Sequence, residues 1–462
     1  MANASSSSST QLPQLPSIVL YEIATWLVND LDDEHHHRIA MATLKSLRLT
    51  CRELARMGNI NRALFKSINL HPTEDNFQRL VQTDLTPIRP FVRQLNFFPS
   101  PYIPGLTRNK FEDMLRAHYS LLGSHCNCCA RRTYEQRMHE HPHGRIPLSD
   151  REITARFLSY TQAAHEDMAL LQDGILPDLW RKELLPLGNV SSIRLCSVTT
   201  LLSRQPYLIN EPELSWCQLC KDNISFMDSI AGPNGDRLFE AVIRTLISTQ
   251  LSVEELKVGC ELEHTFQPGW SDSSWRQLNL DKLKTITIDS VPFCDRSESD
   301  FVRSSSATRA CTAVIKKVQK TVQSMTLCRD YDGLPDLIWP PDSQLELLPM
   351  RSVHLKGFNL HHEDFADTII GLTRLDKLVL ERCDTRNWRT IFDAVSSKPT
   401  PLDFKCIDIY DDMDYWNFDM KKKDEVEAHP DVNAGTLLQK RLYLYLTHRE
   451  AWNDDLELWF AP

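Results

Sequence analysis

The chain has 462 residues, of which 42% are hydrophobic, 25% charged and 8% aromatic. These proportions are typical of globular proteins and exclude a collagen-like, coiled-coil or wholly disordered chain. The formal net charge is −10. Nucleic acid is therefore not expected as a partner, because binding to phosphates depends on clustered Lys and Arg.

The start of the chain and its cysteines predict a cytoplasmic or nuclear location. Residues 1–14 are rich in Ser and have neither the basic segment nor the apolar stretch of a secretory signal, so we expect a disordered tail. The 13 cysteines have no framework spacing and are expected to be reduced thiols. No run of about 18 uncharged apolar residues occurs, so no membrane partner is expected.

Residues 15–65 predict a short helical module. Apolar side chains recur at spacings of three and four residues near 17–27 and again near 38–56, and this spacing places each set on one face of a helix. A polar, charge-dense loop separates the two expected helices. The first face carries Leu20, Ile23, Ala24 and Leu27, and the second carries Leu44, Leu47, Cys51 and Leu54.

The order of residues in this module resembles an F-box. The opening pair Leu15-Pro16 is followed by the first amphipathic helix, then by Leu47-Arg48-x-x-Cys51-Arg52 and by the closing pair Leu64-Phe65. Two features depart from the family pattern. Ile18 stands where the family often has an acidic residue, and the loop at 28–37 is longer than usual.

The resemblance implies that the apolar face of the module binds a Skp-type adaptor, and through it a cullin–RING ubiquitin ligase. Several residues of this face must also hold the module's own core. The alternative is an ordinary helical cap on the domain that follows. The adaptor-binding residues that the resemblance implies are Leu15, Pro16, Leu20, Ile23, Leu27, Leu44, Leu47 and Leu54.

A second pattern repeats along the rest of the chain and predicts short strands. Each repeat has three apolar residues at positions 1, 4 and 6. The side chains at positions 4 and 6 point to the same side of a strand, because side chains alternate along it. The triplets are Phe65-Ile68-Leu70, Val92-Leu95-Phe97, Val190-Ile193-Leu195, Leu214-Cys217-Leu219, Val253-Leu256-Val258, Leu283-Ile286-Ile288, Val322-Met325-Leu327, Met350-Val353-Leu355, Leu375-Leu378-Leu380 and Phe404-Ile407-Ile409.

Helical periodicity lies between several of these triplets, at 236–249, 307–322, 361–372 and 388–395. Alternating strands and helices predict an α/β fold, and stacked units of this kind form a leucine-rich-repeat-like solenoid with its strands on the concave side. The array resembles the degenerate leucine-rich repeats that follow F-boxes in many fungal proteins. An ordinary α/β sheet domain is the alternative, although no Gly-rich strand-to-helix turn appears.

The repeats are interrupted once. The step from Leu95 to Ile193 is 98 residues, which is too long for one repeat. We therefore expect first repeats at 66–98, a helical and loop insertion at 99–189, and the main solenoid at 190–412. A long helix is expected in the insertion from Ser149 to about Gln172, with one apolar face made of Ile153, Phe157, Tyr160, Ala164, Met168 and Leu171.

The C-terminal stretch, residues 413–462, is expected to cap the last repeat. Its apolar residues run from Leu437 to Leu446 and continue at Leu456, Trp459 and Phe460. A capping element of this kind covers the apolar side that the final repeat would otherwise expose.

One set of residues in the insertion has the chemistry of a zinc site. Thiolates and imidazoles are preferred zinc ligands. A pair of cysteines and a pair of histidines are separated by nine residues, whereas the zinc-finger template has about 12 or more residues between its two pairs. We expect a polar loop with unligated thiols, no metal and no cofactor. The weak candidate ligands are Cys126, Cys129, His139 and His143.

The sequence has no nucleophile elbow, phosphate loop, HExxH motif or dinucleotide fingerprint, so no catalytic residue is assigned and no enzyme is expected. The pair Cys217-x-x-Cys220 is better explained by a strand triplet than by redox chemistry. An unrecognised enzyme centred on the insertion is the least favoured function.

The order of parts predicts a substrate-recognition subunit of an SCF-type cullin–RING ubiquitin ligase. The alternative is a repeat-based interaction scaffold outside the ubiquitin system. The target protein would bind the concave face, where the residue between the last two apolar positions of each strand is exposed. These residues are Arg194, Lys257, Thr287, Thr326, His354, Val379 and Asp408.

Overall fold

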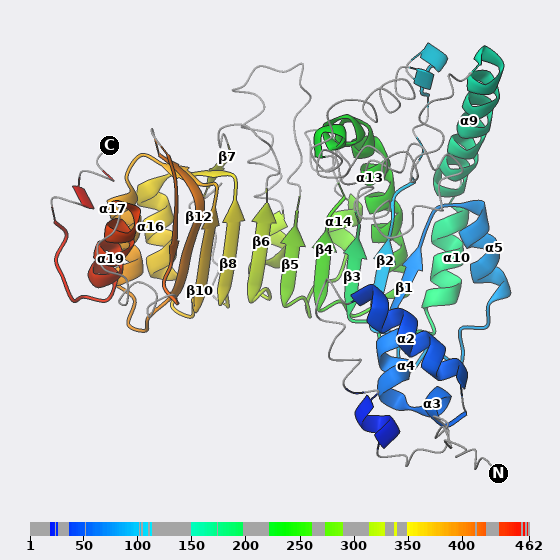
Figure 1. Ribbon diagram of the computed structural model, residues 1–462, viewed down its shortest axis with the longest axis horizontal. Coiled ribbons are helices and arrows are strands. Elements are labelled where there is room, and N and C mark those ends of the chain that lie inside the picture. The colour runs from blue at the N-terminus through cyan, green and yellow to red at the C-terminus, as the bar shows by residue number, and fades with distance from the viewer. Residues whose placement is uncertain are drawn as a thin grey trace, which may run out of the picture.

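The chain folds into a mixed α/β structure built around one long sheet and a second, small sheet (Figure 1). Helices lie along one side of the long sheet, and a helical bundle lies beyond the amino-terminal ends of its first strands. Within the described ranges, no helix is both long and apolar enough to cross a lipid bilayer. The computed structural model describes residues 19–23, 25, 37–50, 52–100, 102, 105–109, 111–112, 149–172, 174–196, 221–260, 273–289, 314–328, 337–339, 349–411, 414–421, 434–453, 456–457 and 460.

Ten strands form the long sheet, and each pairs with the next of these strands along the chain. All neighbours run parallel except the last two, which form an antiparallel pair. The strands are β1 (Ser67–Leu70), β2 (Gln94–Phe97), β3 (Ser192–Leu195), β4 (Glu255–Val258), β5 (Thr285–Ile288), β6 (Ser324–Cys328), β8 (Ser352–Lys356), β10 (Lys377–Glu381), β12 (Asp403–Asp411) and β13 (Asp414–Asp419).

The apolar triplets explain where the strands form. Burial alternates along β4, β5, β6 and β8, so side chains such as Leu256 and Val258 enter the core while Lys257 between them stays partly exposed. The predicted strands are confirmed at β1 to β6, β8 and β10. The triplet centred on Cys217 lies outside the described residues. The strands on either side of it in the sequence, β3 and β4, pair directly with each other.

The register predicted for the last triplet is wrong. In β12, Phe404 and Cys406 lie opposite Leu378 and Leu380, where the triplets predict Ile407 and Ile409, and the Cys406 side chain is buried. The register shifts just after Cys406, where Asp408 has a φ of +48°. A bulge of this kind inserts an extra residue and moves the following side chains to the other face of the sheet.

The predicted helices at 236–249, 361–372 and 388–395 are confirmed, and the first of them extends further toward its N-terminus. The long helix expected from Ser149 is also confirmed. The single helix expected near 38–56 is divided in two. The helices are α2 (His37–Thr50), α3 (Arg52–Arg56), α4 (Gly58–Leu64), α5 (Glu74–Gln82), α9 (Asp150–Gln172), α10 (Ile175–Leu184), α13 (Lys221–Thr249), α14 (Ser273–Gln277), α16 (His362–Gly371), α17 (Trp388–Ser396) and α19 (Ala434–Leu446).

Buried apolar side chains gather in three separate clusters. The largest joins the sheet to the helices on its apolar side. A second lies under α9 and contains Ile153, Tyr160 and Ala164 from the predicted helix face. The third belongs to the N-terminal helices and contains Leu20, Leu44, Leu54 and Ile60. The N-terminal helices therefore have a core of their own.

The C-terminal end of the sheet is closed by a strand that the sequence pattern did not predict. β13 turns back along β12, pairs with it in an antiparallel sense and forms the last strand of the sheet. α19 contacts α17 and β13, and the buried side chains of Leu456 and Phe460 belong to the same hydrophobic cluster as the sheet. Trp459 lies outside the described residues.

The small sheet is formed by short strands that follow strands of the long sheet: β7 (Leu337–Trp339), β9 (Phe358–Leu360) and β11 (Asp384–Thr385). Between β8 and β9 the chain turns at Gly357, whose φ is +75°. Its backbone N–H donates to the carbonyl of Glu381 on the neighbouring strand. A residue with a Cβ is strained in this conformation.

We expect Gly357→Ala to lower the free energy of unfolding by about 1 kcal/mol, since the added Cβ disfavours a left-handed backbone. Gly371→Ala is the matched control, because a Cβ at Gly371 meets no atom within 4 Å and its φ is not positive. Urea unfolding of the two variants compares the effects. Equal stability of both variants would contradict the strain assigned to Gly357.

Candidate functional site

The long sheet aligns a row of mostly polar side chains on the face opposite its core. Strand pairing places one residue of each strand at the same height, and most of these side chains are partly exposed. This alignment includes six of the residues predicted for the concave face. The sheet-face row consists of Asn69, Asn96, Arg194, Lys257, Thr287, Thr326, His354, Val379 and Lys405.

Asp408 does not belong to this row. Lys405 lies opposite Val379 and takes the position that was predicted for Asp408. The cause is the register of β12, in which Phe404 and Cys406 lie opposite Leu378 and Leu380. Val379 is aligned with the row, but its side chain is only 6% exposed, so it contributes little surface.

Charged members of the row are paired with carboxylates on the next strand. The Arg194 guanidinium lies 3.1 Å from the Glu255 carboxylate, and the Lys257 ammonium lies 2.8 Å from that of Asp289. At the other end, the Lys405 ammonium lies 2.6 Å from the Asp419 carboxylate. Partly exposed pairs like these contribute about 0–1 kcal/mol each to stability.

His354 occupies the centre of the row's C-terminal half. Its Nε2 atom lies 3.3 Å from the Glu381 carboxylate, which also binds the Lys356 ammonium at 3.1 Å. Burial lowers the pKa of His354, although Glu381 opposes this effect. The imidazole is therefore neutral at neutral pH and acts as a hydrogen-bonding group rather than a cation.

Cys328 lies at the end of β6, next to these charges. Burial raises the pKa of its thiol to about 12, and the Asp289 carboxylate adds to the shift. The thiolate is the nucleophilic form of cysteine, and this environment suppresses it. The sheet face thus offers hydrogen bonds and paired charges to a ligand, but no activated nucleophile at Cys328.

The N-terminal helices place the implied adaptor-binding residues in two kinds of environment. Leu20, Leu44 and Leu54 are at most 1% exposed and hold the module's core, and Ile23 and Leu47 are half-buried against them. These residues come together as the amphipathic pattern predicts, but the first three are not available to a partner. Leu15, Pro16 and Leu27 lie outside the described residues.

Other apolar side chains of the module point outward. Leu49 in α2 is 82% exposed, and Val19 and Tyr21 in the first helix are 38% and 51% exposed. Sequence reasoning missed all three. A signal was present for Leu49, because it falls outside the stripe formed by Leu44, Leu47 and Leu54.

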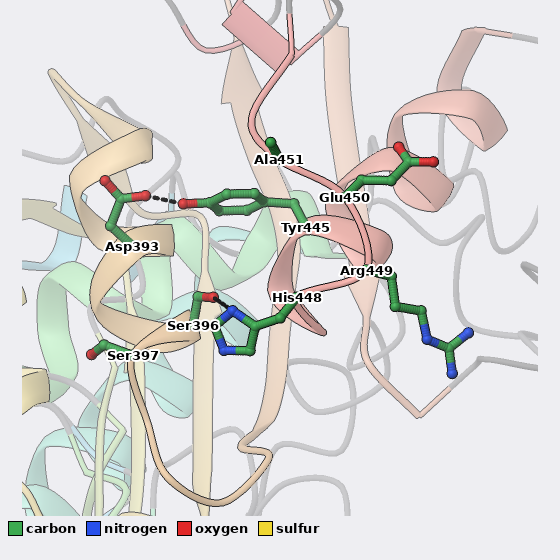
Figure 2. Close-up of a pocket in the computed structure, with 8 residues that line it drawn as sticks. All are labelled: Asp393, Ser396, Ser397, Tyr445, His448, Arg449, Glu450 and Ala451. Carbon is green, nitrogen blue, oxygen red and sulfur yellow. Dashed lines mark hydrogen bonds between the residues drawn. The ribbon is translucent and has the colours of Figure 1, made fainter.

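A pocket lies between α17 and α19 at the far end of the molecule (Figure 2). Two hydrogen-bonded pairs cross it: the Tyr445 hydroxyl donates to the Asp393 carboxylate, and Ser396 Oγ lies 3.3 Å from His448 Nδ1. The carboxylate of Asp393 is directed to Tyr445 and not to His448. Ser396, His448 and Asp393 therefore do not form a Ser–His–Asp relay. The two hydrogen bonds instead link α17 to the C-terminal end of α19.

The candidate zinc ligands Cys126, Cys129, His139 and His143 lie outside the described residues. Among the residues that the structure does describe, no group of three or more His, Cys, Asp or Glu side chains is arranged to hold a metal ion. The free thiols there include Cys260, Cys383 and Cys406, which are buried.

Comparison with known proteins finds no family model and no curated protein that matches the chain.

Proposed function

We propose that the chain is a substrate-recognition subunit of a cullin–RING ubiquitin ligase. In this proposal the N-terminal helices bind a Skp-type adaptor, and the sheet-face row binds the target protein. The subunit makes and breaks no bonds itself. It accelerates ubiquitin transfer by raising the effective concentration of the target near the conjugating enzyme.

The observation that carries this proposal is the independence of the N-terminal module. Its core is separate from that of the sheet, and the bundle of α2, α3 and α4 lies beyond the end of the sheet (Figure 1). A cap whose only role was to cover the first strand would bury its apolar side chains against that strand. In the proposal, Leu49, whose side chain is 82% exposed, is the residue of α2 that contacts the adaptor.

The finer architecture is part of the proposal. We assign the long sheet and its helices to a leucine-rich-repeat-like solenoid, with the sheet-face row on its concave side. Pairing in chain order supports this assignment, since each strand–helix unit then buries its apolar side against its neighbours. The array also presents a long surface to a target protein.

A binding assay with a purified Skp-type adaptor tests the proposal. We expect the full chain to bind, and Leu49→Asp to weaken binding by at least about 30-fold, which corresponds to an anchor residue worth about 2 kcal/mol. Leu158→Asp is the matched control, because Leu158 is 60% exposed on the distant helix α9. Circular dichroism of each variant verifies its fold.

Lack of adaptor binding by the folded wild-type chain would contradict the ligase proposal. Target binding by the sheet without any adaptor would then favour the interaction scaffold.

A further inference from the structure

A groove lies between α16 and α17, on the helical side of the long sheet (Figure 1). Its volume is about 420 Å³. On the α16 side it is lined by Glu363, Asp367 and Ile370. These residues are spaced by four and three positions, so they form one stripe along the helix, with the two carboxylates one turn apart. The Ile370 side chain is 54% exposed at the end of this stripe.

The α17 side and the floor complete the groove. Thr390, Asp393 and Ser397 are spaced by three and four positions and form a matching stripe on α17. The floor contains Ala366 and Ala394, which are 4% and 2% exposed. Their methyl groups leave the space between the two helices open. The groove is therefore apolar at its base and polar along both sides.

The cations on and just after α17 are held by other groups. The Lys398 ammonium donates to the Leu372 carbonyl at 2.8 Å, just beyond the end of α16. The Arg389 guanidinium lies 3.3 Å from the Glu457 carboxylate. Among the described residues that line the groove there is no Lys or Arg. The charge that the groove presents is therefore negative.

The carboxylates of the groove differ in what they bind. Asp393 accepts a hydrogen bond from the Tyr445 hydroxyl, as Figure 2 shows. Glu363 and Asp367 are exposed on α16, and no described Lys or Arg forms an ion pair with either. A partner with basic side chains therefore meets two carboxylates one turn apart, next to the apolar surface of Ile370.

We infer that this groove binds a short amphipathic helix of another protein. Its apolar side chains cover Ile370 and the alanine floor, and its Lys or Arg side chains pair with Glu363 and Asp367. A trough between two helices is a surface on which an amphipathic helix lays its apolar face. Complementary charge favours a basic helix and disfavours an acidic one. The inference uses neither the N-terminal module nor the sheet-face row, so it is independent of the ligase proposal.

Fluorescence anisotropy of labelled peptides with the full chain tests this inference. The probe is a peptide of about 14 residues, long enough for nearly four helical turns, with Leu on one face and Lys beside it. One control peptide has the same residues in scrambled order, and the other has Glu in place of Lys. We expect the probe to bind at least about tenfold more tightly than either control.

Variants of the chain locate the binding. Ile370→Ala should weaken binding of the probe by about fivefold, and the double variant Glu363→Gln, Asp367→Asn by about tenfold. The pair Asp178→Asn, Asp281→Asn removes the same charge from exposed positions on α10 and before β5, and should leave binding unchanged. Circular dichroism of each variant verifies its fold.

Two results would overturn the inference. Equal binding of all three peptides, or equal loss in both double variants, would mean that the probe senses only the net charge of the chain. Dimers of the full chain in sedimentation that Ile370→Ala dissociates would mean that a second copy, and not a basic helix, occupies the groove.

Discussion

Replacing Phe392 with Ala is expected to lower the free energy of unfolding by about 4 kcal/mol. Phe392 in α17 has no exposed surface and lies at the centre of the cluster that closes the C-terminal end of the sheet. Truncation would leave a cavity that this cluster cannot easily fill, because its members are held by several elements. The rings around Phe392 belong to Trp388, Phe404, Trp416, Trp452 and Phe460.

Urea unfolding followed by tryptophan fluorescence measures this effect. Ile370→Ala on the neighbouring helix α16 is the control, because its side chain is 54% exposed and its truncation should cost about 0.5 kcal/mol or less. A loss below about 1 kcal/mol for Phe392→Ala would mean that the aromatic cluster is not the tightly packed cap described above.

The second large effect concerns two buried groups with opposite dependence on pH. Asp167 in α9 accepts a hydrogen bond from Ser100 at 2.7 Å, and burial raises the pKa of its carboxyl to about 7. Its contribution to stability is present below pH 4 and is lost as the pH rises toward 7. His71 is stacked on Phe98, and burial lowers its pKa to about 4. Its contribution is present above pH 6.5 and is lost as the pH falls toward 4.

In the wild type these two contributions oppose each other between about pH 4 and 6.5. We expect Asp167→Asn and His71→Phe each to remove one of these two contributions to stability. Relative to the wild type, Asp167→Asn should gain stability as the pH rises from 4 to 7, and His71→Phe should lose stability as the pH rises from 4 to 6.5. Each change is on the order of 3 kcal/mol, since one pKa unit corresponds to about 1.4 kcal/mol.

Urea unfolding at four pH values between 4.5 and 7.5 tests this expectation, with the stability of each variant subtracted from that of the wild type. Flat differences for Asp167→Asn and His71→Phe would show that neither group titrates as its burial requires.

Much of the long sheet could be predicted from the sequence because its strands obey one local rule. Leu256 and Val258 point to the core, so Lys257 must point away, and equal spacing in each repeat brings the outward residues to the same height. The helix faces of α9, α16 and α17 follow in the same way from the helical period.

The remaining features depend on interactions that no local pattern records. Asp408 lies outside the sheet-face row because β12 aligns Lys405, three residues earlier, with Val379. The module illustrates the same limit. Leu20, Leu44 and Leu54 form an apolar stripe, but the stripe does not say whether a partner or the module itself covers it. Leu49 falls outside the stripe, which signals its exposure, but its use by a partner does not follow from the stripe.

Hydrogen–deuterium exchange of the full chain, with and without a purified Skp-type adaptor, tests the central claim most directly. The proposal predicts that the adaptor slows exchange in α2 and α3 and leaves the strands of the sheet-face row unchanged. Slower exchange in β4 to β8 with no change in α2 and α3 would contradict it, because the adaptor would then occupy the surface assigned to the target.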